Sequence, residues 1–226
     1  MRHRRVTLVV VGLRTYLGRE VCRFGRALGH RMVAVVDGQP PELTEPWMHG
    51  IHWMTDTDPL TASWPDDPLA AILYCDTTLW EGDLWEGGRR SFEEVLLKRP
   101  QQLMEAAAEH TPPLRFVLRS TVRQPFLPSR FTAFCREAER RLVDTDLPSS
   151  IFRLPLLYGP DRPDSVAAMA ISRILSRLPL LGGRAPRTMR VETAALAMLR
   201  AALEPDICGV FKPDDIARLG DVMIAQ

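Results

Sequence analysis

The sequence predicts an α/β protein in which a doubly wound parallel sheet carries a small C-terminal cap. The first observation is a series of short apolar runs typical of buried strands, at Val6–Val11, Met32–Val36, Ile51–Met54, Ala70–Tyr74, Leu114–Leu118 and Ile151–Arg153. The second is that segments with apolar residues at helical spacing lie between several of these runs. The third is a glycine turn that joins the first run to the first helical segment. Strands that alternate with helices form parallel sheets, because each crossover returns the chain to the same edge.

The first two apolar runs, with the glycine turn between them and Asp37 after them, have the sequence form of a dinucleotide-binding βαβ unit. Gly12 permits a tight turn out of the strand, and Gly18 lets the helix pack close to the sheet. The N–H groups at the helix start attract a pyrophosphate. The Asp37 carboxylate can accept hydrogen bonds from an adenosine ribose. The candidate cofactor-binding residues of this Rossmann-like unit are therefore Gly12, Arg14, Thr15, Tyr16, Leu17, Gly18 and Asp37.

Thr15 departs from this pattern, because it occupies the place of the middle glycine. A side chain there keeps the backbone away from the phosphates, so we expect a dinucleotide to shift or to bind more weakly. An inherited fold with a decayed pocket is the alternative. Asp37 repels a 2′-phosphate and favours NAD, whereas Arg14 can pair with that phosphate and favour NADP. We expect NAD, with NADP as the alternative and with weak or lost binding left open.

Three further polar residues follow the third and fourth strands. Asp56 is a candidate contact for adenine, with a helix cap as the alternative, and Cys75 and Thr77 are expected over the cofactor's ribose. The helix after the glycine turn is expected to pack through Val21, Phe24 and Leu28. The loop Leu79–Arg90 is either a flap or a surface excursion.

The second half of the chain continues the alternation. A long helix is expected over Ser91–His110, with a kink or break at Pro100. A second helix is expected over Phe131–Val143, and a crevice loop over Leu154–Pro160. Beyond Asp161 we expect four elements in a cap over 161–226 that packs on a core over 1–160 as a single unit: a helix over Ser165–Leu178, a helix over Val191–Leu203, a strand over Cys208–Lys212 and a final helical turn over Pro213–Leu219.

Composition excludes several classes of function. The net charge is +1, so no general attraction to nucleic acid or to an anionic membrane is indicated. The first apolar run is too short for a membrane span. The four cysteines show no CxxC pairing, which argues against a zinc site and a disulfide framework. His49 and His52 lack further ligands, so no metal is expected. We expect a cytoplasmic protein with free thiols.

The chain resembles an atypical short-chain dehydrogenase/reductase of the extended, epimerase-like type. The resemblance rests on the glycine turn and on Phe116–Thr121, Phe152-Arg153, Tyr158-Gly159-Pro160, Val191–Ala195 and Asp214–Gly220. It is closest to the NAD(P)H-binding proteins grouped with the Tat-interacting tumour-suppressor oxidoreductase. The resemblance implies a Rossmann core, a nicotinamide cofactor and a small carbonyl or alcohol substrate. It also implies a homodimer through Ser91–His110 and Phe131–Val143.

Such enzymes use a Ser or Thr, a Tyr and a Lys four residues after the Tyr. Ser120 or Thr121 fills the first role here, whereas the tyrosine and lysine positions fall on Thr132 and Arg136. A threonine hydroxyl cannot serve as the general acid or base. Arg136 can still hydrogen-bond ribose hydroxyls. Two hypotheses follow: an oxidoreductase or epimerase with a rearranged proton relay, and a catalytically inactive nucleotide-binding regulatory or scaffold protein.

Overall fold

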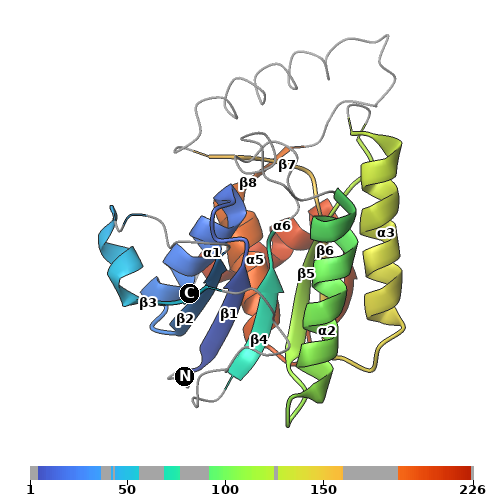
Figure 1. The fold of residues 1–226 in the computed structure, drawn as a ribbon. Coiled ribbons are helices and arrows are strands. Elements are labelled where there is room, and N and C mark those ends of the chain that lie inside the picture. The colour runs from blue at the N-terminus through green and yellow to red at the C-terminus, as the bar shows by residue number, and fades with distance from the viewer. Residues whose placement is uncertain are drawn as a thin grey trace, which may run out of the picture.

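The computed structural model describes residues 5–36, 42, 44–55, 69–76, 92–124, 127–159 and 188–224. These residues form one parallel sheet of seven strands, a separate pair of short strands, and flanking helices (Figure 1). The strands of the large sheet are β1 (Thr7–Val11), β2 (Arg31–Val36), β3 (Ile51–Thr55), β4 (Leu69–Tyr74), β5 (Arg115–Thr121), β6 (Ser149–Leu154) and β9 (Gly209–Phe211). The α-helices are α1 (Tyr16–Ala27), α2 (Arg99–Glu109), α3 (Ser129–Val143), α5 (Val191–Leu203) and α6 (Pro213–Ile224).

The strand order is β3-β2-β1-β4-β5-β6-β9, and every neighbouring pair is parallel. The chain moves outward from β1 to β3 and then returns to lay β4 on the other side of β1. This reversal makes a topological switch point between β1 and β4, where open α/β sheets bind ligands. The predicted doubly wound parallel fold is confirmed, with β1 inside the sheet.

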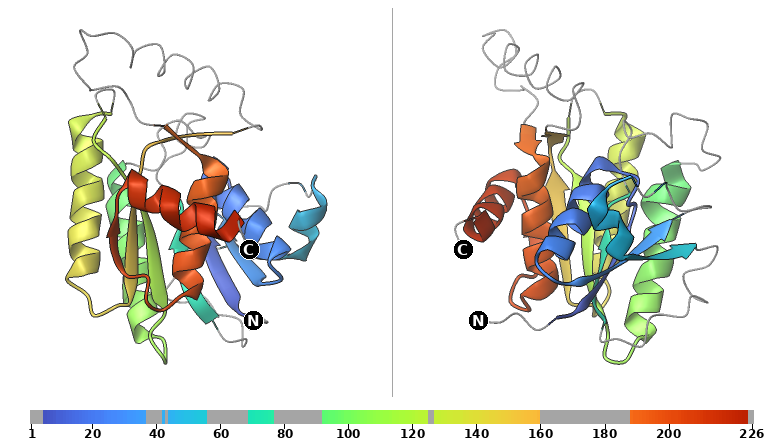
Figure 2. Two further views of the ribbon diagram at one scale, coloured as in Figure 1. Left: turned by 180° about the vertical axis from the view of Figure 1, so that it is seen from behind. Right: turned by 90° about the vertical axis from the view of Figure 1, so that its left-hand side faces the viewer.

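Helices cover both faces of the sheet (Figure 2). Alternate β1 residues point to opposite faces: Leu8 and Val10 pack in a cluster with α1, α5 and α6, whereas Val9 and Val11 pack in a cluster with α2 and α3. All four side chains are fully buried, and each contributes about 1.5–3 kcal/mol relative to an exposed position. Burial on both faces explains why the strands are continuously apolar rather than alternating.

Two helix boundaries follow from local chemistry. Helix α1 ends at Ala27, and Gly29 adopts φ +85°, a left-handed conformation that glycine adopts without strain. Leu28 is therefore the C-cap and 43% exposed, so its predicted place on the buried face is wrong. In the predicted 91–110 helix, the π-helical turn η3 (Glu94–Lys98) precedes α2, and the Arg99 N–H donates to the Glu94 carbonyl. The expected irregularity near Pro100 is thus a change of helix type.

The C-terminal elements join the core. Strand β9 extends the sheet beside β6, and α5 packs against α1 and α6. Helix α6 continues past Leu219, where the sequence predicted its end. At Gly220 the helix packs closely on α5, since a Cβ there would lie 2.7 Å from Thr193 Cγ2 of α5. The division of the chain at residue 160 stays a prediction.

The predicted crevice loop after β6 is partly wrong. Its residues include β7 (Leu156–Tyr158), which pairs in parallel with β8 (Thr188–Arg190). The two strands stabilise each other by hydrogen bonding outside the large sheet, which the sequence between 154 and 160 could not indicate. The predicted elements at 79–90 and 165–178 lie outside the described residues.

Candidate functional site

The turn after β1 is built by two glycines. Gly12 has φ +89°, and a Cβ there would lie 2.7 Å from the backbone N of Asp76, just beyond β4. A Cβ on Gly18 would overlap the carbonyl oxygen of Gly12. Both positions therefore need glycine, the first for backbone conformation and close approach, the second for the contact between α1 and the turn. These are the mechanical roles that the sequence predicts for them.

Thr15 forms the N-cap of α1. Its Oγ1 accepts a hydrogen bond from the Gly18 N–H at 3.0 Å and lies 2.7 Å from the Gly12 carbonyl oxygen, to which it donates. The first N–H groups of a helix have no intrahelical acceptor, so a threonine here satisfies one group that a phosphate could otherwise bind. The buried Thr15 side chain thus stabilises the turn and takes up part of the anion-binding capacity of the helix.

The other predicted residues of the turn have different environments. Leu17 is fully buried in the core, and Arg14 is exposed. Tyr16 is 9% exposed, and its hydroxyl end lies against Gly159, directly after β7, where a Cβ would overlap it. Because Gly159 has no side chain, Tyr16 at the start of α1 can pack against the residue that follows β7.

At the end of β4, the backbone carbonyl of Cys75 lies close to Thr15 and Arg119. The Cys75 side chain is fully buried in the cluster with α1 and α5, whereas its carbonyl oxygen accepts a hydrogen bond from Arg119 Nη1 at 3.1 Å. Thr15 Oγ1 lies 3.4 Å from the same oxygen. Arg119 is 6% exposed and ties β5 to β4. Arg119 directly follows the apolar residues Phe116, Val117 and Leu118 of β5, and no role in the site was predicted for it from the sequence.

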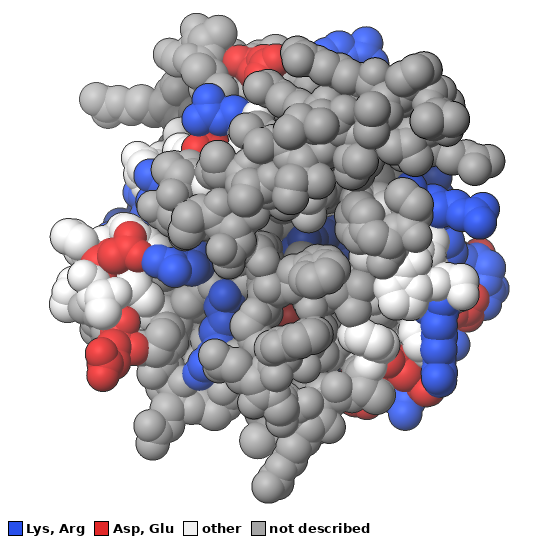
Figure 3. Space-filling view, turned by 90° about the horizontal axis from the view of Figure 1, so that it is seen from above, with Lys and Arg blue, Asp and Glu red and all other residues white. Residues whose placement is uncertain are grey.

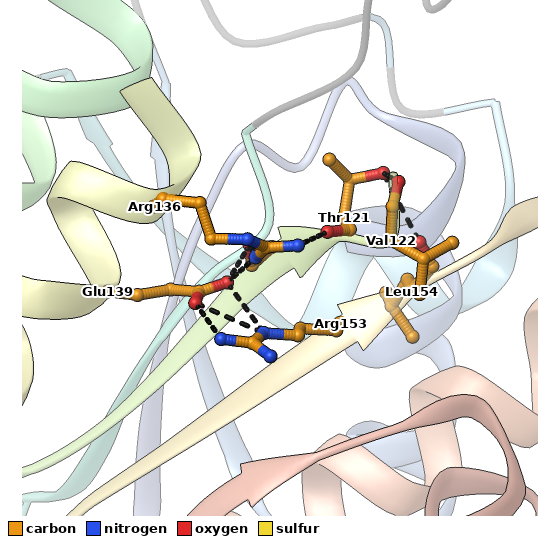
Figure 4. Close-up of polar contacts among 7 residues, drawn as sticks. Thr121, Val122, Arg136, Glu139, Arg153 and Leu154 are labelled. Carbon is orange, nitrogen blue, oxygen red and sulfur yellow. Dashed lines mark hydrogen bonds and ion pairs between the residues drawn. The ribbon is translucent and has the colours of Figure 1, made fainter. Parts of the chain in front are cut away.

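A second group of polar residues gathers at the carboxyl ends of β5 and β6, under α3 (Figure 4). The 4% exposed Glu139 carboxylate is its centre. Glu139 Oε1 accepts hydrogen bonds from Ser120 Oγ and Arg136 Nη1, and Glu139 Oε2 accepts one from Arg153 Nη2 at 2.6 Å. Arg136 Nη1 also donates to Ser120 Oγ at 3.2 Å, and its Nη2 donates to the Thr121 carbonyl at 2.7 Å. We call Ser120, Arg136, Glu139 and Arg153 the Glu139 cluster.

Simple geometry brings the Glu139 cluster together. Arg136 and Glu139 are three residues apart and share one face of α3. Ser120 and Arg153 are register partners on the parallel strands β5 and β6. Two guanidinium groups surround one carboxylate, so the cluster holds one positive charge in excess. Because the Arg136 and Arg153 side chains are 33% and 31% exposed, this excess charge faces partly to solvent.

The predicted catalytic hydroxyls are hydrogen-bonded within the protein. Ser120 is 2% exposed and donates to Glu139, and Thr121 Oγ1 lies 3.1 Å from the Val122 carbonyl and donates to it. Thr132 lies one helical turn before Arg136 and is half-buried. The neighbouring Cys135 thiol is kept neutral, because burial raises its pKa to about 12. The structure thus brings Ser120, Thr121 and Arg136 together, and the predicted Asp37, Asp56 and Thr77 lie outside the described residues.

Sequence reasoning missed Glu139 and Arg153. Glu139 stands in a run of charged residues that reads as a solvent-facing surface, and only its three-residue spacing from Arg136 hinted at a shared face. As arranged, the cluster can stabilise an anion or hold a hydroxyl hydrogen on a carboxylate. Viewed from above the carboxyl ends of the strands, Lys and Arg atoms are visible near the middle of the molecular face (Figure 3).

The described residues contain neither a metal-binding group of side chains nor a membrane-spanning helix. Among these residues no three His, Cys, Asp or Glu side chains are grouped so as to hold a metal ion. None of the helices in the described ranges has the length and apolar character needed to cross a membrane.

No protein-family model and no curated protein sequence matches this chain. Solved structures are similar in fold. A putative epimerase from Burkholderia cenocepacia superposes with a TM-score of 0.63 at 16% identity, covering 98% of this chain and 82% of its own. The enzyme WbmH from Bordetella bronchiseptica, in complex with NAD+, gives 0.64 at 14% identity, covering 98% and 81%. The human epimerase family protein SDR39U1 (isoform 2), with NADPH, gives 0.61 at 16% identity, covering 91% and 72%.

Proposed function

We propose that this protein binds a nicotinamide adenine dinucleotide at the switch point between β1 and β4. The observation that carries the proposal is the turn after β1, where Gly12 and Gly18 hold the N-terminus of α1 against the carboxyl end of the sheet. Solved structures with the same fold were determined with NAD+ or NADPH. Those likenesses support the cofactor class.

The choice between NAD and NADP depends on residues at the adenosine end. Asp37 favours NAD through its carboxylate, and the exposed Arg14 is the candidate partner for a 2′-phosphate. We expect NAD(H) to bind more tightly than NADP(H). Titration calorimetry with NAD+, NADH, NADP+ and NADPH tests both statements. Absence of heat with all four would overturn the proposed function.

The fold also supports an oxidoreductase or epimerase-like activity on a small carbonyl or alcohol. The sequence resemblance is what suggests the branch of short-chain dehydrogenases/reductases around the Tat-interacting oxidoreductase. In that case Ser120 or Thr121 would donate a hydrogen bond to the substrate oxygen. Nicotinamide absorbance during incubation with a panel of carbonyl and alcohol substrates measures hydride transfer. Turnover that disappears in Ser120→Ala or Thr121→Ala would support catalysis, and an inactive panel would count against it.

A specific observation favours a second candidate, a nucleotide-binding regulatory or scaffold protein without turnover. The Ser120 hydroxyl hydrogen is already held by Glu139, and Thr132 supplies no ionisable group near it. Binding in calorimetry together with an inactive substrate panel is the expected result. The double variant Thr132→Tyr/Arg136→Lys reintroduces a proton donor and a lysine, so recovered turnover would show that only these two positions limit the site.

A further inference from the structure

The two sides of the switch point differ in the hydrogen-bonding groups that they offer a ligand. A dinucleotide that crosses this point lays one nucleotide over β1–β3 and the other over β4–β6. On the first side the described residues offer the turn and the start of α1, of which Thr15 satisfies one N–H group. On the second side Ser120, Thr121 and Arg136 are hydrogen-bonded to one another, to Glu139 or to backbone carbonyls.

Arg136 is the clearest case on the second side. Its Nη1 contacts Ser120 Oγ and Glu139 Oε1, and its Nη2 donates to the Thr121 carbonyl. A ribose that recruited the Nη1 end of Arg136 would take this donor from a carboxylate that is 4% exposed. Leaving a buried carboxylate with one charge partner fewer is strongly unfavourable. The Glu139 cluster therefore opposes the use of Arg136 by a ligand.

The two hydroxyl groups beside it are held in the same way. The Ser120 hydrogen is directed to Glu139, and Thr121 Oγ1 donates to the carbonyl of Val122 at 3.1 Å, with the Leu154 carbonyl 3.4 Å away. A nucleoside on this side would have to replace these internal hydrogen bonds with equivalent ones. Such an exchange yields little net affinity, because bonds are lost as others form.

We propose that the protein recognises its ligand through the adenosine diphosphate ribose part and gains little affinity from the nicotinamide nucleoside. The ligand class is thus an ADP-ribose-type nucleotide, of which NAD is one member. The inference rests on the proposed function, since both use the site at the turn after β1. It adds that NAD+ and free ADP-ribose bind with similar affinity.

Titration calorimetry of the full-length protein with NAD+, ADP-ribose and nicotinamide mononucleotide tests this. We expect the dissociation constants of NAD+ and ADP-ribose to agree within about fivefold, and nicotinamide mononucleotide to bind at least about a hundredfold more weakly than ADP-ribose. A larger preference for NAD+, or binding of the mononucleotide close to that of ADP-ribose, would overturn the inference and leave the proposed function standing. If none of the ligands binds, the proposed function itself fails. If NADP+ proves to be the tighter cofactor, the comparison is made with 2′-phospho-ADP-ribose.

The role of the Glu139 cluster is tested by Glu139→Ala, which frees Arg136 and Ser120. The preference for NAD+ over ADP-ribose should rise by about tenfold or more. A general gain of positive charge acts equally on the diphosphate of both ligands, and it repels the pyridinium cation that only NAD+ carries, so it cannot by itself raise this ratio. Glu137→Ala, on the same helix but in a surface ion pair, should leave the ratio unchanged. If folded Glu139→Ala has the same NAD+/ADP-ribose affinity ratio as wild type, the Glu139 cluster is not the cause of the weak contribution of the nicotinamide nucleoside. If that variant does not fold, the affinity ratio of the wild-type protein still tests the inference itself.

Discussion

The two sides of the switch point are built from different materials. The side at β1 depends on backbone: a left-handed glycine, a second glycine against its carbonyl, and a helix start. The side at β5, α3 and β6 depends on charged side chains around one buried carboxylate. The first arrangement is enforced by steric contact, whatever the protein binds. The second can be rebuilt by exchanging a few side chains, so chemistry can change there while the fold is kept.

The comparison predicts its largest effect at Glu139. Glu139→Ala leaves two guanidinium groups and Ser120 without their common acceptor, which we expect to cost about 3 kcal/mol, toward the lower end for a buried pair because both arginines are partly exposed. The melting temperature should fall by roughly 8 °C, which differential scanning calorimetry measures. Glu137→Ala is the control on the same helix and should change little. Equal melting temperatures for the two variants would mean that the Glu139 cluster does not hold α3 to the sheet.

The next largest effect is expected at Gly18, on the other side. In Gly18→Ala the new Cβ overlaps the Gly12 carbonyl, so α1 must move away from the turn at a cost of about 2 kcal/mol. Dinucleotide binding should be lost as well, because the helix start no longer meets the diphosphate. Gly29→Ala is the matched control: it has φ +85° and nothing within 4 Å of its Cβ, so it should cost about 1 kcal/mol of strain and leave binding intact. Retained affinity in folded Gly18→Ala would contradict a site at this turn.

Substitutions of Thr15 are expected to change the stability of the protein and its affinity for a dinucleotide in different ways. Thr15→Ala removes the N-cap hydrogen bond to Gly18 and should lower stability by about 1 kcal/mol. Thr15→Gly should cost only a few tenths of that amount and should also tighten dinucleotide binding several-fold, because backbone and phosphate can then approach. Chemical denaturation and calorimetry measure the two quantities. Weaker binding in Thr15→Gly would show that the threonine hydroxyl helps to hold the ligand.

The fold could be predicted because its signals are local. Apolar runs long enough for buried strands and one glycine turn determine the order β1-α1-β2, and the structure follows them closely. Apart from Leu28, where α1 ends next to the left-handed Gly29, the errors concern residues whose role depends on a distant partner. Helix α6 continues past Leu219, where Gly220 contacts α5, and strand β7 forms where it pairs with β8.

The site could be predicted only in part for the same reason. The positions of Ser120, Thr121 and Arg136 follow from the order of strand and helix. Whether their polar atoms are available depends on Glu139 and Arg153, which come from another turn of α3 and from the next strand. A glutamate among arginines reads as surface charge until the fold shows what lies beneath it. Whether a polar side chain already has hydrogen-bond partners depends on the folded structure, and no local sequence pattern indicates it.

The smallest effect concerns the surface of the same helix, where Glu137 forms ion pairs with Arg140 and Arg141. Hydrogen bonds from Arg140 and Arg141 lower the pKa of Glu137 to about 2. Because the folded pKa lies below the unfolded value of about 4.3, its stabilisation is present above that value and is lost as the pH falls toward about 2. Glu137→Gln should therefore be slightly less stable than wild type at pH 7, and the two should converge in acid.

Thermal unfolding of wild type and Glu137→Gln between pH 7 and about pH 2 measures this convergence. High salt should already remove the difference at pH 7, because exposed ion pairs are screened, whereas salt should affect the Glu139→Ala difference much less. A salt-resistant Glu137 effect as large as that of Glu139 would contradict the distinction between the two faces of α3. The charges that stabilise α3 would then lie on its outer surface, and the Glu139 cluster would not be what holds α3 to β5 and β6.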